Sequence, residues 1–140
     1  MSCGVPDESP LVAAARTYPG VRFQEGVRDP LLVSMAEDCA DLLAARGTQG
    51  YRRDGHPAWD ERYGKIWEKL RMKPVEVTAQ ADRNLTNAPL VDVATNMYDA
   101  WQQSEGHWEV IEEPHARYGD AMAKGTEGVW FGCIITADPD

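Results

Sequence analysis

Few side chains in this sequence could do chemistry, and they are widely spaced. The chain contains three histidines and three cysteines. Ser104 and His107 are three residues apart, a spacing at which a hydroxyl and an imidazole can be neighbours and act as nucleophile and base. No third partner and no strained nucleophile turn accompanies them. A lone histidine in a Gly-His turn is more often structural, and His115 follows a Glu-Glu-Pro run typical of a loop.

The three cysteines do not form a disulfide framework or a metal-binding motif. No pair has CxxC spacing. We interpret Cys39 and Cys133 as small buried side chains and Cys3 as part of a terminal tail. A Cys39–Cys133 bridge stays open as an alternative, because spacing along the chain does not give distance.

Composition limits the classes of function. The 140 residues include 14 Lys and Arg against 23 Asp and Glu, a net charge of −9. This balance argues against binding of nucleic acid or of anionic membranes, although it could attract cations. No apolar run approaches the roughly 20 residues of a membrane span. The N-terminus lacks the pattern of a secretory signal, so we expect a cytoplasmic or assembly-associated protein.

Helical signals dominate the first two thirds of the chain. Asp29 and Pro30 suit a helix start and Gly47 suits a helix end, so apolar spacing predicts a helix over 30–46. Further helices are predicted over 11–15, 60–72 and from Pro89 to Trp101. The stretch 107–111 is predicted to be irregular.

Strand signals follow in the last third and in one short internal segment. The β-branched run 75–79 predicts a strand in which Glu76 points opposite to Val75 and Val77. A hairpin is predicted, with strands over 120–124 and 129–137 around a turn at 125–128. Apolar residues on both sides of its second strand predict helices on both faces of the sheet. The fold class is α+β: a three-layer α-β-α sandwich with a largely antiparallel central sheet. An N-terminal arm (1–19) would precede one domain (20–140).

One stretch resembles a known family signature. The segment from Trp101 through Ser104, Gly106 and His107 to Ile111 is similar to the W-x-x-S-x-G-H-x-x-x-I signature of the CAP superfamily. That superfamily includes cysteine-rich secretory proteins, antigen 5 and plant pathogenesis-related proteins. The resemblance extends over about residues 20 to 137. It is supported by the helix after Asp29, by Tyr118-Gly119 and by Gly128-Val-Trp130-Phe131.

The resemblance implies a cleft lined by two histidines and acidic residues. His107 matches the histidine of the Gly-His motif, and His56 matches the other histidine. Glu76 falls at the family's Gly-Glu-Asn element, although Val75 and Val77 replace its glycine and asparagine. Ser104 stands where the eukaryotic cleft has a second acid, as in many shorter bacterial members. Trp59 and Trp108, each close to a histidine, together with Ser104 could line a ligand groove.

Three functions follow from this resemblance. The first is a non-catalytic binding module for a partner protein or a small apolar ligand, motivated by the missing acid and the altered Glu-Asn element. The second is a zinc-assisted hydrolase or peptidase, in which His56 and His107 hold zinc or another divalent cation and Glu76 acts as base. The third is a component of a larger assembly, for example a virion. Glu76 also has a simpler interpretation as a solvent-facing strand residue. The family is mostly secreted.

Overall fold

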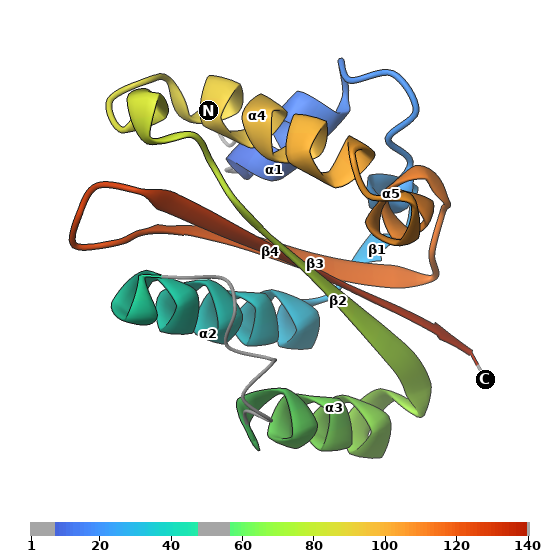
Figure 1. Cartoon of the computed structure of the whole chain (residues 1–140). Helices are drawn as coiled ribbons and strands as arrows, with labels where there is room; N and C mark the ends of the chain where they lie inside the picture. The colour runs from blue at the N-terminus through green and yellow to red at the C-terminus, as the bar shows by residue number, and fades with distance from the viewer. Residues whose placement is uncertain (1–7, 48–56, 140) are drawn as a thin grey trace, which may run out of the picture.

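The fold, obtained as a computed structural model, is described over residues 8–47 and 57–139. It consists of helices and one sheet (Figure 1). In chain order the elements are α1 (Pro10–Ala15), the 3-10 helix η1 (Phe23–Glu25), β1 (Val27–Arg28), α2 (Pro30–Arg46), α3 (Pro57–Leu70), β2 (Met72–Gln80), the 3-10 helix η3 (Arg83–Leu85), α4 (Leu90–Gln102), α5 (Glu105–Glu112), β3 (Arg117–Lys124) and β4 (Trp130–Pro139). The mixed α and β content agrees with the predicted class.

The described strands form a four-stranded mixed sheet in the order β1-β3-β4-β2. β4 pairs antiparallel with both β3 and β2, so that Glu76 lies opposite Ile135 and Val77 opposite Ile134. β1 was not predicted, and it runs parallel to β3. The sheet is therefore not purely antiparallel. The predicted hairpin is present. Its first strand begins three residues earlier than expected, and its second strand begins one residue later and ends two residues later.

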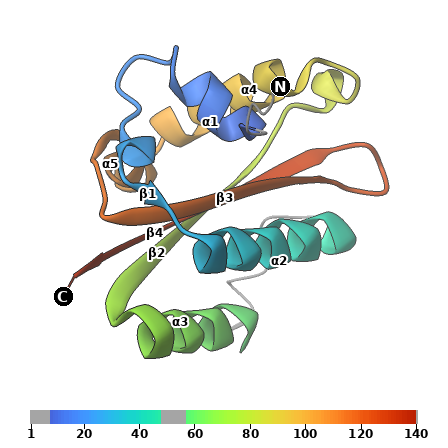
Figure 2. The same ribbon diagram turned by 180° about the vertical axis from the view of Figure 1, so that it is seen from behind.

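Helices lie on both sides of the sheet. α2 and α3 lie on one side and α1, α4 and α5 on the other, as both views show (Figures 1 and 2). Each side has its own buried cluster, in which Leu32, Cys39 and Ile135 belong to the α2 side and Met97, Trp101 and Ile134 to the α4 side. Within the described ranges, no helix is long and apolar enough to span a membrane.

The helix over 30–46 has the predicted bounds, and its ends explain why. The Asp29 carboxylate accepts hydrogen bonds from the backbone N–H groups of Leu31 and Leu32, and Pro30 occupies the first turn. Gly47 ends the helix at φ 76°, in the left-handed region that suits glycine. α2 then packs closely on β3, because a Cβ on Gly119 would lie 2.2 Å from the backbone of Leu32.

The stretch after Gly106 differs from the prediction. Residues 107–111 were expected to be irregular, but they belong to the helix α5, which begins at Glu105 and ends at Glu112. Ser104 occupies the N-cap position, so the sequence break near Gly106 marks the junction of two helices. His107 is therefore placed on a rigid helical surface that packs beside α4.

Candidate functional site

A groove brings two of the predicted site residues to the same place. It has a volume of about 340 Å³ and is lined by one tyrosine of α3, a run of β2 and one side of α5: Tyr63, Pro74, Val75, Glu76, Val77, Gly106, His107 and Val110. Tyr63 and Val75 are 38% and 45% exposed, although both are large apolar residues. The groove thus offers an apolar surface beside one imidazole.

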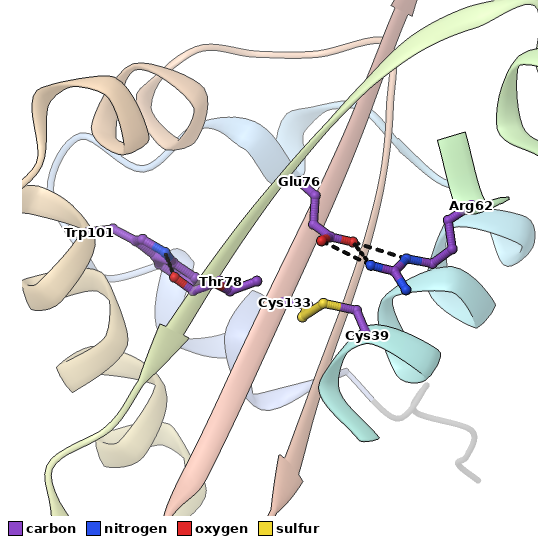
Figure 3. The surroundings of a disulfide bond; sticks show 6 residues. All are labelled: Cys39, Arg62, Glu76, Thr78, Trp101 and Cys133. Atoms are coloured by element: carbon purple, nitrogen blue, oxygen red, sulfur yellow. Dashed lines mark hydrogen bonds and ion pairs between the residues drawn. A yellow bond between two sulfur atoms is a disulfide. The ribbon is translucent and has the colours of Figure 1, made fainter. Parts of the chain in front are cut away.

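Glu76 belongs to this groove by its position on β2, but its carboxylate lies on the opposite side of the strand. Its side chain is fully buried beside Arg62 of α3, whose side chain is 6% exposed. The Arg62 guanidinium donates to both carboxylate oxygens, at 2.7 Å to 3.1 Å (Figure 3). The interpretation of Glu76 as a solvent-facing residue is therefore wrong, because a buried guanidinium compensates its charge.

The alternation of β2 explains this arrangement. Val77 packs in the α4-side cluster, whereas Ile135, opposite Glu76, packs in the α2-side cluster. Successive strand residues point to opposite faces. Val75 and Val77 therefore face α5, and the Glu76 carboxylate faces α3. The structure places Glu76 and His107 at one groove but directs the Glu76 carboxylate away from the face that carries His107.

The remaining residues of the motif have separate positions. His107 is exposed on α5. Ser104 caps this helix through its backbone, since its carbonyl accepts from the Trp108 N–H at 2.8 Å. In residues 8–47 and 57–139, no hydrogen bond joins the Ser104 hydroxyl to the His107 ring. Trp108 packs on the N-terminal segment instead: its ring lies 6.0 Å from that of Tyr18, and a Cβ added at Gly20 would lie 3.3 Å from it.

Two predicted residues cannot be placed in this site. His56 lies outside the described residues, and the side chain of Trp59 does too, although its backbone belongs to α3. Among the side chains that are described, no group of three or more His, Cys, Asp or Glu residues is arranged to hold a metal ion. Of the two predicted zinc ligands, His56 and His107, the described residues include only His107.

Sequence reasoning missed two residues that position the groove. Arg62 was not singled out, although it lies four residues before the buried Ile66 and hence on the same side of α3. His115 was given little weight. Its ring nitrogens lie 2.6 Å from Asp138 Oδ2 and 2.7 Å from the Val110 carbonyl oxygen. His115 therefore connects the last turn of α5 to the end of β4.

The two cysteines beside the ion pair are bonded to each other. Cys39 of α2 and Cys133 of β4 form a disulfide with a Cα–Cα distance of 6.3 Å, and both residues are fully buried (Figure 3). The prediction of burial is confirmed. The interpretation as unbonded thiols is wrong, because two residues 94 positions apart meet where α2 packs on the central strand β4.

The face of the sheet that α1, α4 and α5 cover carries a group of aromatic residues. Burial raises the pKa of Tyr18 to about 12, and a hydrogen bond from its hydroxyl to Asp99 Oδ1 at 2.5 Å adds to the effect. Burial also raises the pKa of Tyr98, which donates a hydrogen bond to the Leu11 carbonyl at 2.6 Å. These phenols stay neutral at physiological pH and act as donors that hold α1 against α4.

A second hollow is larger but chemically different. It has a volume of about 530 Å³ and is lined by amides, carboxylates and alanines of β2, α4 and the segments that follow them: Gln80, Ala81, Asp82, Asn96, Asp99, Ala100 and Gln103. None of the predicted site residues lines it. Asp99 and Asn96 already accept hydrogen bonds from Tyr18 and from the Asp82 N–H. The groove beside His107 is therefore the better candidate.

Comparison with known proteins finds no match: no protein-family model fits the sequence, and neither a curated protein nor a solved structure is significantly similar to it.

Proposed function

We propose that the protein is a CAP-like domain that acts as a non-catalytic binding module, with the groove between α3, β2 and α5 as its ligand site. The observation that carries this proposal is the exposure of Tyr63 and Val75 in a groove of about 340 Å³ that His107 also lines. A volume of this size lies within the range of small-molecule sites, and the two exposed large side chains supply its apolar contact surface. The ligand is a partner protein or a small apolar molecule.

The behaviour of the signature residues supports the CAP-like assignment. Trp101 and Ile111, at the two ends of the signature, are buried, whereas His107 between them is exposed on the groove. A signature that belongs to a ligand site should combine scaffold residues with an accessible imidazole in this way. The helices on both faces of the sheet support the three-layer α-β-α sandwich that the assignment requires (Figure 1).

The state of Glu76 favours binding over hydrolysis. A general base must reach the water or proton on which it acts. The Glu76 carboxylate accepts hydrogen bonds from Arg62 through both oxygens and is fully buried. For Glu76 to serve as base, this ion pair would have to open at a large cost in desolvation. We therefore rank the hydrolase second, and the role in a larger assembly stays a prediction to be tested by light scattering and partner pull-down.

The disulfide supports one further part of the proposal. Structural disulfides persist mainly in oxidising compartments and are rare in the cytosol. The buried Cys39–Cys133 bond therefore favours an oxidising environment over the cytoplasmic location expected from the N-terminal sequence. Alkylation of free thiols, followed by mass spectrometry of the protein from its native source, tests this point.

The binding role is tested by NMR with neutral apolar fragments added to the isotopically labelled protein. We expect shift changes to gather on Tyr63, on 74–77 and on 106–110. Val75→Asp should abolish them. Val27→Asp is the matched control, because Val27 is also an exposed valine, 56% accessible, but lies on β1 at the opposite edge of the described sheet. Shift changes that persist in Val75→Asp would contradict the proposal.

Zinc titration by calorimetry separates the binding module from the hydrolase. The hydrolase requires one-site zinc binding that is lost in His107→Ala, followed by peptidase activity that a chelator removes. For the proposed binding module, we expect fragment binding at the groove without chelator-sensitive peptidase activity. Zinc-dependent peptidase turnover that occurs in the wild type but not in His107→Ala would contradict the binding module and establish the hydrolase.

A further inference from the structure

We propose that the groove binds an extended, positively charged peptide segment of a partner protein, with apolar side chains against Val75 and Tyr63 and cationic side chains beside α5. This inference rests on the proposed binding function and names the class of ligand. Three features of the groove carry it: its shape along β2, its apolar lining, and the charge of the helix surface next to it.

The shape of the groove favours a linear ligand. Four consecutive residues of β2, from Pro74 to Val77, form one wall. At about 3.3 Å per residue, this wall is roughly 13 Å long, the span of about four residues of extended chain. β2 is an outer strand of the sheet formed by the described residues. A chain in extended conformation can therefore lie along it without displacing another strand.

The lining of the groove favours apolar side chains on one side of that ligand. Tyr63 and Val75 are two of the five large hydrophobic residues that the described part of the chain exposes. They come from α3 and β2, and Val110 of α5 completes the apolar lining. An extended peptide presents alternate side chains to opposite sides. Every second residue could therefore pack on this lining while the others point outward.

The exposed surface of α5 beside the groove is acidic. Glu105, Glu109 and Glu112 recur at helical spacing and form an exposed strip on α5. Glu109 lies three residues after Gly106, about one helical turn further along, and so brings this strip to the edge of the groove. No ion pair involves these three glutamates in the part of the chain that the structure describes. Of the nearby cations, Arg62 is bound to Glu76 and Lys73 already has an interaction partner. A ligand with basic residues would complement this strip.

The experiment measures binding of three short, end-blocked peptides by fluorescence anisotropy. One alternates valine and lysine, one alternates valine and glutamate, and one alternates serine and lysine. We expect only the valine–lysine peptide to bind well. Replacing the three glutamates together, Glu105→Gln, Glu109→Gln and Glu112→Gln, should weaken its binding by about tenfold, because rim charges contribute modestly and add up.

The matched control removes the same charge from the other side of the sheet. Glu37→Gln, Asp38→Asn and Asp41→Asn change three exposed acids of α2 and should leave binding unchanged. Equal binding of the valine–glutamate peptide, or equal weakening in both triple variants, would overturn the inference. If apolar fragments bind in a Val75-dependent way but no peptide does, the inference fails and the binding function stands. If neither fragments nor peptides bind, both fail.

Discussion

The two faces of the sheet hold their helices by different kinds of contact. On the α2 and α3 face, side chains are joined to side chains: Cys39 to Cys133, and Arg62 to Glu76. On the α1, α4 and α5 face, the two buried aromatic side chains Tyr98 and Trp101 donate hydrogen bonds to backbone carbonyls, those of Leu11 and Thr78. Removing one partner on the first face leaves a buried group without its complement. Removing a donor on the second face loses one hydrogen bond.

The largest effect is expected from the disulfide. Replacing both cysteines, Cys39→Ala with Cys133→Ala, should lower the free energy of unfolding by about 4 kcal/mol, because the bond closes a loop of some 94 residues. Urea unfolding measures this change. Cys3→Ala, which removes the third thiol, is the control and should leave the midpoint unchanged. An unchanged midpoint of the wild type under reducing conditions would contradict the prediction.

The ion pair comes next. Arg62→Met should destabilise the fold by about 3 kcal/mol, because it leaves the Glu76 carboxylate buried without its guanidinium. Adding Glu76→Leu to that variant should restore part of the loss, since the stranded charge is then removed. Urea unfolding of the single and double variants makes the comparison. A double variant as unstable as Arg62→Met would show that packing, not charge, sets the cost.

A smaller effect is expected on the opposite face. Trp101→Phe keeps an aromatic ring but removes the donor that lies 2.9 Å from the Thr78 carbonyl. We expect a loss of about 2 kcal/mol by urea unfolding, since the ring is buried and the carbonyl loses its partner. Trp130→Phe is the matched control, because its bond to the Thr86 carbonyl is longer, at 3.3 Å, and only partly buried. Equal losses in the two variants would contradict this ranking.

The smallest effect concerns pH. Burial and the Asp99 contact raise the pKa of Tyr18 from 10.0 to about 12, so the folded state favours the neutral phenol. The resulting stabilisation is full below pH 10 and is lost as the pH rises from 10 to 12. The unfolding free energy of wild type should fall more steeply in this window than that of Tyr18→Phe. The difference should stay below about 1 kcal/mol, because the group is partly exposed. If the unfolding free energies of wild type and Tyr18→Phe fell in parallel between pH 10 and pH 12, the prediction would be contradicted.

Elements with strong local signals could be predicted from the sequence. α2 has a capping carboxylate, a proline in its first turn and a glycine at its end, and its predicted bounds agree with the structure. The helix α3 was predicted to start at Asp60 and to continue to Met72. It starts at Pro57 and ends at Leu70, because Arg71 takes a left-handed conformation with φ 54°. Pro74 lies beyond this end, inside β2.

Elements that depend on distant partners could not be predicted in this way. β1 has two residues and exists only because β3, some 90 positions later, pairs with it. From the sequence, a glutamate between two valines of a strand is expected to be exposed. The packing of α3 on β2 supplies the guanidinium partner that allows Glu76 to be buried. His107 is exposed on α5. Helix α5 itself was not predicted, because Gly106 near its start interrupts the helical pattern of the sequence.

The position of β4 has a consequence for how the molecule is made. β4 follows every other described strand in the sequence, yet it lies inside the sheet and pairs with both β2 and β3. On the ribosome, α2, α3 and β2 are synthesised long before the strand that joins them. Neither the sheet nor the Cys39–Cys133 bond can form until Cys133 has emerged. The apolar faces of these helices therefore stay uncovered until then, and the fold is completed only after β4 has been synthesised.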